Sequence, residues 1–488
     1  MIIIKNITKY VLGEILFEGV SFVLHKGDKV GLVGPNGSGK STLLKIILGE
    51  VDYDNGSVDV ENERIGYLPQ KIFFQPDDTI KTFLNTDEIS EKGILKQVGL
   101  NTVSNESLIN KLSGGQKTRL AMARVLLQKP SVIILDEPTN HLDIKGLEWL
   151  EEFIKNFRGI VLAVSHDRRF LDNSVNKIFE IDSENKKFNE YQGGYSLYVQ
   201  EREKSLERQG DDYNRQQKEK KRLEQWLILK KQEAHVHPDP AKGKQIRAME
   251  RRLEREIYSQ EIVKPKSFGK IKGMNLSGET TASKLMVRCL DLAKKFGEKW
   301  VLWKINFEVR GEERVLLAGD NGCGKTTLLK IIIGSLKHDG GNLKIGDAVN
   351  VGYFAQEHEN LDQNLTVIEE FKKTDRLINY QKEPRAILGS FLFKDQDVFK
   401  KVSDLSLGEK VRLIFAKLTN QENQLLILDE PTNHLDIVSR EIIEEALLNY
   451  KGSIIAVSHD RHFIEKIKFD RILNLSGGIV TESFRTNN

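Results

Sequence analysis

Residues Gly34–Ser41 read Gly-Pro-Asn-Gly-Ser-Gly-Lys-Ser, and this stretch decides the fold of the chain around it. An apolar run, residues 29–33, precedes it, and a helical pattern over Thr42–Leu48 follows it. A strand, a glycine-rich loop and a helix start in this order are typical of a phosphate-binding loop. The glycines let backbone N–H groups converge on phosphate oxygens, and the helix N-terminus adds a positive dipole. The motif predicts an α/β nucleotide-binding domain, but it does not choose among ATPases, GTPases and kinases.

The side chains around this loop have separate expected tasks. Lys40 would reach the terminal phosphates, and the Ser41 hydroxyl would bind Mg²⁺. A second apolar run, residues 132–135, ends in Asp136 and Glu137. Asp136 can hold the metal, and Glu137 can polarise an attacking water, as phosphoryl transfer requires.

Between the loop and that run lies a second candidate anion site. Leu112-Ser113-Gly114-Gly115-Gln116 opens a predicted helix over Lys117–Gln128. A serine and two glycines at a helix start expose N–H groups at the positive end of the dipole. One domain seldom needs two phosphate cradles. We therefore expect two such domains to face each other, each contributing one cradle to a shared nucleotide.

The second half of the chain repeats these motifs in the same order. Gly319–Thr326 reads Gly-Asp-Asn-Gly-Cys-Gly-Lys-Thr, and Asp429-Glu430 again follows an apolar run. Leu405-Ser406-Leu407-Gly408-Glu409 takes the place of the serine–glycine stretch. We predict two nucleotide sites built head to tail, each with its loop from one copy and its serine–glycine stretch from the other: Lys40 with Ser406 and Gly408, and Lys325 with Ser113 and Gly115.

Leu407 departs from the pattern, because the first copy has Gly114 at this position. A leucine adds a side chain near the γ-phosphate cradle of the site that contains Lys40. We hypothesise that the two sites hydrolyse their nucleotide at different rates.

Taken together, these motifs resemble the ATP-binding cassette. The resemblance also rests on His141-Leu142-Asp143, His434-Leu435-Asp436, Ser165-His166-Asp167 and Ser458-His459-Asp460. In each copy it implies a glutamine that couples Mg²⁺ and water to a helical subdomain, an aspartate in a loop that crosses the dimer interface, a switch histidine that touches the γ-phosphate, and an aromatic ring that stacks on adenine. These residues are Gln70 and Gln356, Asp143 and Asp436, His166 and His459, and Tyr10 and Phe296.

The expected site residues fall into three sets. The catalytic set is Glu137, Glu430, His166 and His459. The Mg²⁺ set is Ser41, Gln70, Asp136, Thr326, Gln356 and Asp429. The nucleotide-binding set is Tyr10, Gly34, Asn36, Gly37, Gly39, Lys40, Ser41, Thr42, Gln70, Ser113, Gly115, Gln116, Phe296, Gly319, Asn321, Gly322, Gly324, Lys325, Thr326, Thr327, Gln356, Ser406, Gly408 and Glu409.

The stretch Leu197–Tyr258 has a different pattern. Apolar residues recur at helical spacings in two stripes, and Pro238 and Pro240 lie between the stripes. A helix cannot run through this break, so we predict an antiparallel helical hairpin with its tip near Glu233–Ala241. The first helix, Tyr198–Gln232, would be roughly 50 Å long. The first stripe is Val199, Leu206, Tyr213 and Leu227, with Lys220 interrupting it, and the second is Ile246, Met249, Leu253 and Ile257.

This predicted hairpin is basic. Between Arg215 and Tyr258 there are 13 Lys and Arg against 7 Asp and Glu, whereas the whole chain has a net charge of only +3. One interpretation is a coiled coil with ordinary charged outer faces. The other is a projecting arm that contacts phosphate, and the concentration of positive charge in one segment favours it.

The composition indicates a soluble globular chain. Of its 488 residues, 39% are hydrophobic and 30% are charged, and no apolar run approaches the ~18–20 residues that cross a bilayer. The apolar run at the start of the chain is too short for a secretory signal, and its positive charge, Lys5, follows the run instead of preceding it. The two cysteines, Cys289 and Cys323, are too few for a disulfide framework or a structural zinc site. We expect a cytoplasmic protein that uses ATP and Mg²⁺, without a membrane partner.

Two cassettes joined by a basic hairpin resemble the ABC-F family. The resemblance also rests on Asn140–Asp143, Asn433–Asp436, Tyr191–Ser196 and Arg385–Phe393. It implies two α/β cassette domains, residues 1–196 and 285–488, and a helical linker, residues 197–284. It also implies a monomeric chain whose cassettes dimerise internally and close on ATP in the tRNA exit site of the ribosome. The linker would contact ribosomal RNA and the P-site tRNA and point toward the peptidyl-transferase centre.

Only about 40 residues separate Gln70 from Leu112, which leaves no room for the family's extra arm, and no long tail follows the last motif before Asn488. By resemblance this favours an antibiotic-resistance factor that displaces drugs from the ribosome, although the linker tip is short. A translation factor that acts on tRNA or stalled ribosomes shares every motif. Two further alternatives are the ATPase of a drug exporter, and a DNA-repair ATPase, which would need zinc cysteines or longer coiled coils.

Overall fold

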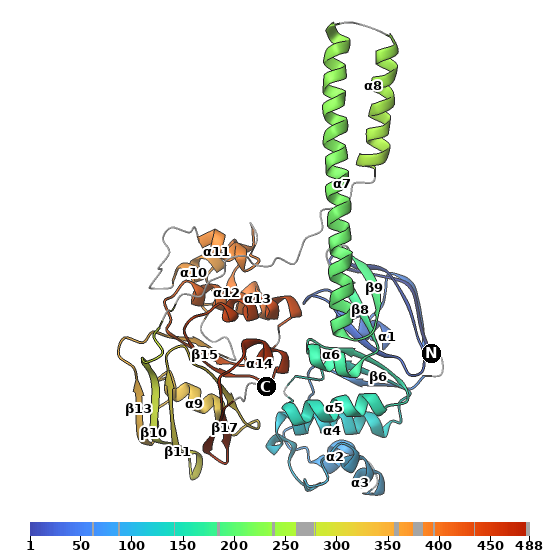
Figure 1. Cartoon of the computed structure of the whole chain (residues 1–488). Helices are drawn as coiled ribbons and strands as arrows, with labels where there is room; N and C mark the ends of the chain where they lie inside the picture. Colours follow the sequence, from blue (N-terminus) through green and yellow to red (C-terminus); the bar gives the residue numbers. More distant parts are fainter. Residues whose placement is uncertain are drawn as a thin grey trace. The chain divides into compact units, whose positions relative to one another are not determined.

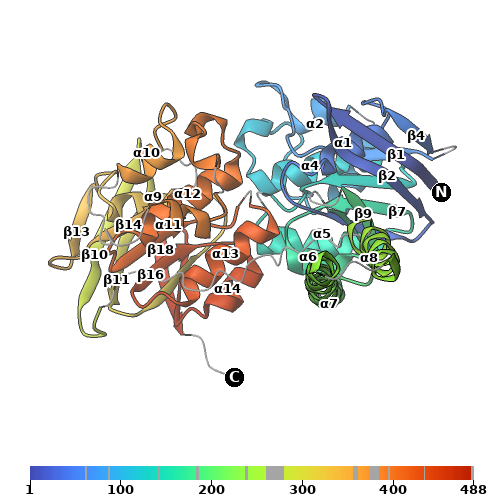
Figure 2. The ribbon, with the colours of Figure 1, turned by 90° about the horizontal axis from the view of Figure 1, so that it is seen from above.

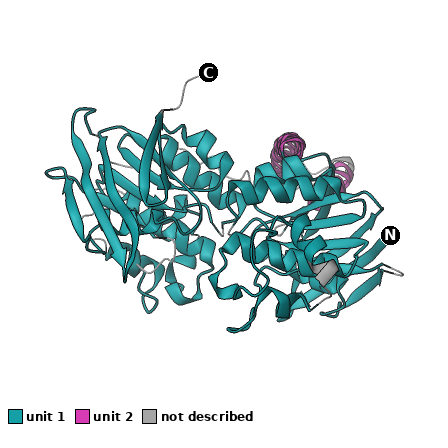
Figure 3. Cartoon of the chain, turned by 90° about the horizontal axis from the view of Figure 1, so that it is seen from below, with its two compact units in different colours: residues 1–195, 273–488 teal, residues 196–272 magenta. Residues whose placement is uncertain are grey.

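The computed structural model describes residues 1–60, 63–85, 88–140, 142–182, 186–236, 240–259, 278, 280–355, 361–373, 384–393, 396–433 and 435–484. The chain forms two compact units (Figure 3): one contains Met1–Tyr195 and Gly273–Asn488, and the other contains Ser196–Lys272. We call the described residues before Ser196 the N-terminal lobe, and those from Gly278 onward the C-terminal lobe. Three predicted motif residues, His141, Gln356 and His434, lie outside the described residues, as does 237–239 of the predicted tip.

The N-terminal lobe contains two sheets. In the first, three antiparallel strands have the order β2(Glu14–Leu24), β1(Ile2–Val11), β4(Asn55–Asp59). In the second, six strands have the order β5(Ile65–Leu68), β6(Val132–Asp136), β7(Ile160–Val164), β3(Lys29–Val33), β8(Lys177–Asp182), β9(Lys187–Gln192). All neighbours in the six-stranded sheet are parallel except β8 and β9.

The C-terminal lobe repeats both sheets (Figure 1). Its three-stranded sheet has the order β11(Lys299–Arg310), β10(Leu285–Phe296), β13(Gly340–Ile345). Its six-stranded sheet has the order β14(Val351–Phe354), β15(Leu425–Asp429), β16(Ser453–Val457), β12(Arg314–Ala318), β17(Arg471–Ser476), β18(Ile479–Phe484). The two lobes share one strand order, so equivalent motifs lie at equivalent places in each lobe.

The helices of the lobes also correspond. The N-terminal lobe has α1(Lys40–Ile47), α2(Ile80–Leu84), α3(Glu88–Gln97), η1(Ile109–Lys111), α4(Gly114–Leu127), α5(Ile144–Asn156) and α6(Arg168–Ser174). The C-terminal lobe has α9(Lys325–Ile332), α10(Val367–Lys372), α11(Pro384–Ser390), η3(Asp397–Phe399), η4(Val402–Asp404), α12(Leu407–Thr419), α13(Ile437–Leu448) and α14(Arg461–Ile467).

The central strands of the parallel sheets are buried on both faces. All five residues of β3, β6 and β7 are buried, and so are all five of β15 and β16. Such strands are near-continuous apolar runs, because no face of a covered parallel sheet meets water. The polar residues that follow these strands are therefore held in place at the edge of a packed sheet.

The smaller unit contains the predicted hairpin. Its helices are α7(Tyr195–Val236) and α8(Pro240–Leu253), and a π-helical turn, η2(Glu254–Tyr258), follows α8. Figures 1 and 2 both place α7 and α8 side by side. Lys231 Nζ lies 2.7 Å from Glu250 Oε1, and the Tyr258 hydroxyl donates to Glu224 at 2.9 Å, so the helices run antiparallel. The predicted fold class, two α/β lobes joined by a long antiparallel hairpin, is confirmed.

The seam of the hairpin differs from the predicted heptad. Its buried core is Leu223, Leu227 and Leu253, with Trp226, Ile246 and Met249 packed against it. Leu227, Ile246, Met249 and Leu253 were predicted; Leu223 and Trp226 were not. The interrupting residue, Lys220, places its ammonium 4.8 Å from the centre of the Tyr258 ring. Lys220 is thus accommodated by a cation–π contact rather than by an apolar partner.

No helix in the described part of the chain has both the length and the apolar character that crossing a membrane requires.

Candidate active sites

The two glycine-rich loops have the same backbone geometry. Gly39 and Gly324 precede α1 and α9 with φ angles of 95° and 109°. A Cβ at Gly39 would lie 2.8 Å from Leu16, and one at Gly324 would lie 2.8 Å from Val301. Both the φ angle and the close packing therefore require glycine at these positions.

The loop lysines are buried at the helix starts. Lys40 Nζ donates to the carbonyls of Gly34 and Pro35 at 2.8 and 2.9 Å. Lys325 Nζ donates to the carbonyls of Gly319 and Asp320 at 2.8 and 3.1 Å. Burial lowers the pKa of Lys40, and the surrounding carboxylates oppose this shift. Each loop therefore curls around a cation at a helix N-terminus, a geometry suited to anionic phosphate.

Each loop faces an aspartate at the end of a buried strand. Ser41 Oγ lies 3.4 Å from Asp136 Oδ1, and Asp429 is 1% exposed. Burial raises the pKa of both aspartates, while the hydroxyls of Ser41 and Thr326 oppose that rise. Within the described residues, neither carboxylate oxygen of Asp429 has a protein hydrogen bond of normal geometry. A hydroxyl beside a buried carboxylate is an oxygen donor set of the kind that Mg²⁺ prefers.

The glutamates after these aspartates share an unusual backbone. Glu137 and Glu430 have φ angles of 51° and 50°, in the left-handed region that residues other than glycine seldom adopt. Their N–H groups donate to the carbonyls of Val164 and Val457, both at 2.9 Å. Burial raises the pKa of each glutamate to about 7. A carboxyl that titrates near neutral pH can accept a proton from an attacking water.

A histidine contacts each glutamate. His166 Nε2 lies 3.3 Å from Glu137 Oε1, and His459 Nε2 lies 3.5 Å from Glu430 Oε1. Burial, followed by the positive charge of the loop lysine, lowers the pKa of His166 well below its usual value and that of His459 to about 4. Both imidazoles are therefore neutral near pH 7. His459 Nε2 also lies 3.0 Å from Asn321 Oδ1, which joins this histidine to the loop of its own lobe.

The serine–glycine stretches form the N-termini of α4 and α12. Ser113 accepts from Gln116 N at 3.2 Å, and Gln116 Oε1 accepts from Ser113 N at 2.9 Å. Ser406 and Glu409 make the same reciprocal pair, at 3.3 and 2.8 Å. These capping boxes leave the following N–H groups at the positive end of each helix.

The lobes meet with each loop beside the other lobe's motifs. The backbone N–H of Asn36 donates to Asp436 Oδ2 at 3.3 Å. A Cβ on Gly408 would lie 3.7 Å from Asn36 Nδ2, so the C-terminal serine–glycine stretch borders the N-terminal loop. A cavity of about 510 Å³ occupies the converse position, since Gly114 lines it from one lobe and Lys325 from the other.

The remaining lining of this cavity joins several predicted residues. It includes Phe296, Asn321, Gly322, Gly324, Thr326, Thr327, Asp429, Glu430 and His459. A second cavity, of about 330 Å³, lies within the N-terminal lobe and is lined by Gln70, Glu137 and Gly114. Tyr10 lines neither cavity and is 45% exposed.

Comparisons with known proteins agree with this geometry. A family profile described as ABC transporter matches residues 17–140 and 302–433, and another with the same description matches residues 181–271. The chain is 31% identical to "ABC transporter F family member 5" of Arabidopsis thaliana, over 98% of this chain and 75% of the relative. The chain belongs to the F family of ATP-binding cassette (ABC) proteins.

Other ABC-F relatives cover the chain equally well. "Ribosome protection protein VmlR" of Bacillus subtilis (strain 168) is 31% identical over 98% of this chain and 87% of the relative. "Energy-dependent translational throttle protein EttA" of Haemophilus influenzae (strain ATCC 51907 / DSM 11121 / KW20 / Rd) is 30% identical over 93% and 88%. A solved complex of archaeal ribosomal stalk protein aP1 and ribosome recycling factor aABCE1 matches with a TM-score of 0.64, at 22% identity over 98% of this chain and 89% of that chain, which shows the shared fold.

As an ABC-F protein, the chain is an ATP-hydrolysing enzyme built from two α/β nucleotide-binding cassettes, and the two lobes are these cassettes. The geometry suits the chemistry, because phosphoryl transfer needs positioning and electrostatic stabilisation more than covalent catalysis. Each site brings together a buried lysine, a helix N-terminus, a carboxylate with a hydroxyl, and a Glu–His pair.

Sequence reasoning missed the buried ion pairs that join the two ABC-F cassettes. Arg168 Nη1 lies 3.1 Å from Glu444 Oε2, and Arg461 contacts Glu151. The pairs are equivalent, because each arginine follows a Ser-His-Asp motif and each glutamate lies eight residues after the Asp of an Asn-His-Leu-Asp motif. That repetition is the signal from which the pairs could have been predicted.

Arg440 was also missed. It is buried on α13, donates to Asp460, and lines the cavity that holds Lys325. Its equivalent in the first cassette is Leu147, so the repeat gives no signal for it.

Proposed function

We propose that this ABC-F ATPase binds the ribosome when ATP closes its cassettes, that the hairpin contacts ribosomal RNA and the P-site tRNA, and that hydrolysis releases the protein. Two relatives, a ribosome protection protein and a translational throttle protein, support a ribosomal role. A cytoplasmic location follows from that proposal.

The observation that carries the RNA contact is a row of cations on α8 and η2. Lys244, Arg247, Arg251 and Arg255 are exposed and are spaced by three or four residues, so they lie along one face. The apolar residues Ile246, Met249 and Leu253 face α7 instead. Exposed cations on one face of a helix suit a polyanion, and binding should weaken as salt rises.

Within each site, the residues have defined proposed tasks. The first site would use Lys40 and the α1 N-terminus for phosphate, and Ser41, Gln70 and Asp136 for Mg²⁺; the second would use Lys325, Thr326, Gln356 and Asp429. A bound Mg²⁺ would supply positive charge that stabilises the phosphates during hydrolysis. Glu137 and Glu430 would orient and deprotonate water, and the neutral His166 and His459 would donate toward the γ-phosphate.

For the biological outcome, we propose displacement of peptidyl-transferase antibiotics by the hairpin tip. The stretch between Gln70 and Leu112 supports this subclass, because its described helices are only the short α2, α3 and η1. The similarity to VmlR supports it as well. A translation factor acting on tRNA or stalled ribosomes is the second candidate, because the similarity to EttA is nearly equal.

A pelleting assay tests ribosome binding. The Glu137→Gln/Glu430→Gln protein should sediment with ribosomes when ATP is present and stay in the supernatant without ATP. Adding Arg247→Gln and Arg251→Gln should weaken sedimentation and its salt dependence. The matched control is Lys337→Gln/Lys344→Gln, which removes two exposed charges from the second cassette. Equal sedimentation of the arginine and control variants would refute the RNA contact through α8.

Expression in a drug-sensitive cell separates the two outcomes. A resistance factor should raise the inhibitory concentration of at least one peptidyl-transferase drug. Unchanged values for all such drugs, together with ATP-dependent ribosome binding, would support the translation factor.

A further inference from the structure

Two aspartates, the buried Asp167 and the partly buried Asp460, line the same cavity between the cassettes. Asp167 and Asp460 each follow a switch histidine, and each begins a helix by accepting from the N–H of Phe170 or Phe463, at 2.9 and 3.1 Å. Burial raises the pKa of Asp167, and the negative charge of Asp460 raises it further. A nearby cation stabilises the charged form of both carboxyls.

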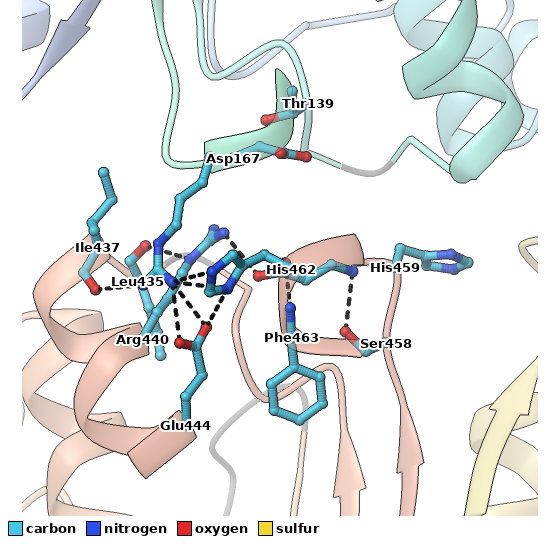
Figure 4. Close-up of polar contacts among 12 residues, drawn as sticks. Thr139, Asp167, Leu435, Ile437, Arg440, Glu444, Ser458, His459, His462 and Phe463 are labelled. Atoms are coloured by element: carbon cyan, nitrogen blue, oxygen red, sulfur yellow. Dashed lines mark hydrogen bonds and ion pairs between the residues drawn. The ribbon is translucent and has the colours of Figure 1, made fainter. Parts of the chain in front are cut away.

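Arg440 supplies that cation (Figure 4). Its Nη1 donates to Asp460 Oδ2 at 3.1 Å, and its Nε donates to the carbonyl of Leu435 at 3.1 Å. The guanidinium is therefore fixed between the loop of the switch histidine and the loop that crosses the interface. Its charge also opposes the rise in the pKa of Asp167 in the other cassette.

The position of Arg440 relates it to both ATP sites. It lines the cavity of the second site together with His459, and Asp167 of the first cassette lines the same cavity. Asp167 directly follows His166, the histidine of the first site. A displacement of Arg440 would therefore alter the positions of the loops that carry His166 and His459.

Only one cassette carries this arginine. Leu147 holds the equivalent place, four residues after Asp143, and is 2% exposed. It lines the same cavity but cannot donate to a carboxylate. The Arg440 guanidinium thus pairs with Asp460 and, together with the charge of Arg461, stabilises the Asp167 carboxylate.

We infer that Arg440 is a positioning residue shared by the two ATP sites. It holds the Asp167 and Asp460 loops in register, so that each site reaches its full hydrolysis rate only when the other is also assembled. The inference depends on the ATPase activity and is independent of ribosome binding.

The test is whether the two sites act additively. ATP turnover of the purified full chain is measured for the unmodified protein, for Glu137→Gln and for Glu430→Gln. Coupling predicts that the turnover of the unmodified protein exceeds the sum of the two single-site variants by about fivefold or more. In the Arg440→Leu background, which copies Leu147, the corresponding ratio should fall to about one.

Two controls separate positioning from a general effect on the interface. Arg168→Leu also removes a buried arginine between the cassettes, but its hydrogen bonds go to Glu444, His462 and the carbonyl of Ile437, and Asp460 acts on it through charge alone. It should lower stability while keeping the coupling ratio. If Arg440→Leu does not fold, Arg440→Lys should keep most of the coupling and Arg440→Gln should lose it. The inference is overturned by additive rates in the unmodified protein, by an unchanged ratio in Arg440→Leu, or by equal ratios in Arg440→Lys and Arg440→Gln.

Discussion

Arg168 of the first cassette lies 3.1 Å from Glu444 of the second, whose side chain has no exposed surface. Lys466 Nζ donates to the same carboxylate at 2.8 Å. His462 Nδ1 lies 3.3 Å from Glu444 Oε1 and 2.9 Å from Arg168 Nη1, so that nitrogen can serve only one of them at a time. Two cationic side chains thus converge on one buried anion. The imidazole of His462 lies beside Glu444 (Figure 4).

Glu444→Gln should destabilise the cassette pair. It removes the carboxylate from the buried Arg168 and from the partly exposed Lys466, and breaking a buried ion pair costs about 3–5 kcal/mol. We expect the apparent melting temperature to fall by several degrees. Lys373→Ala, which removes an exposed ion pair with Asp362, is the control and should have almost no effect. A similar change in both variants would contradict the importance of the buried cluster.

The same glutamate predicts a dependence on pH. Burial raises the pKa of Glu444, but His462, Arg168 and Lys466 outweigh burial and hold it at about 2. Because this value is below that of the unfolded chain, the stabilisation is complete above about pH 4.5 and is lost as pH falls toward 2. The linked contribution is about 3 kcal/mol at neutral pH. The difference in melting temperature between the unmodified protein and Glu444→Gln should therefore shrink from pH 7 to pH 3, and a constant difference would contradict the shifted pKa.

The left-handed backbone of Glu137 predicts an unusual response to glycine. Glu137→Gly should be more stable than Glu137→Ala by about 1 kcal/mol, because glycine adopts a positive φ angle without strain. Glu152, an exposed residue of α5, is the matched control, and there glycine should be less stable than alanine. Thermal denaturation of the four variants tests the prediction, which fails if glycine is the worse residue at both positions.

The pair Leu407 and Gly114 predicts unequal ATP sites. Leu407 is 51% exposed at the first position of α12 and directly precedes Gly408, where a Cβ would lie 3.7 Å from Asn36 in the loop of the first site. In the Glu430→Gln background, in which only the first site turns over, Leu407→Gly should raise turnover several-fold. In the Glu137→Gln background, Gly114→Leu should lower it, because Gly114 lines the second cavity. Equal turnover of Glu137→Gln and Glu430→Gln would remove the hypothesis.

The sequence predicted most of the fold because its strongest signals are local. Gly34–Ser41 and Gly319–Thr326 each require a strand, a turn with positive φ angles and a helix, and those elements are present. The sequence around Pro238 and Pro240 also separated the two helices of the hairpin, since α7 ends at Val236 and α8 begins at Pro240. The heptad was less reliable, since Leu223 and Trp226 pack on α8 while Val199, Leu206 and Tyr213 remain partly exposed.

The contacts between the cassettes could not be predicted to the same extent. The φ angles of Glu137 and Glu430 depend on hydrogen bonds to neighbouring strands, which no local pattern encodes. Arg440 has no counterpart in the repeat, and its task depends on Asp167, 273 positions earlier. The contacts of such residues form only in the folded chain, where segments far apart in the sequence meet.

The unmatched arginine has a consequence for how such an enzyme is encoded. Two identical chains assembled about a true rotation axis would duplicate every side chain, so a guanidinium in one half would always face its own twin. A single polypeptide with both halves in tandem is free of that constraint and can place a charged side chain in one half opposite an uncharged one in the other. Covalent fusion thus permits an asymmetry that a homodimer could not encode.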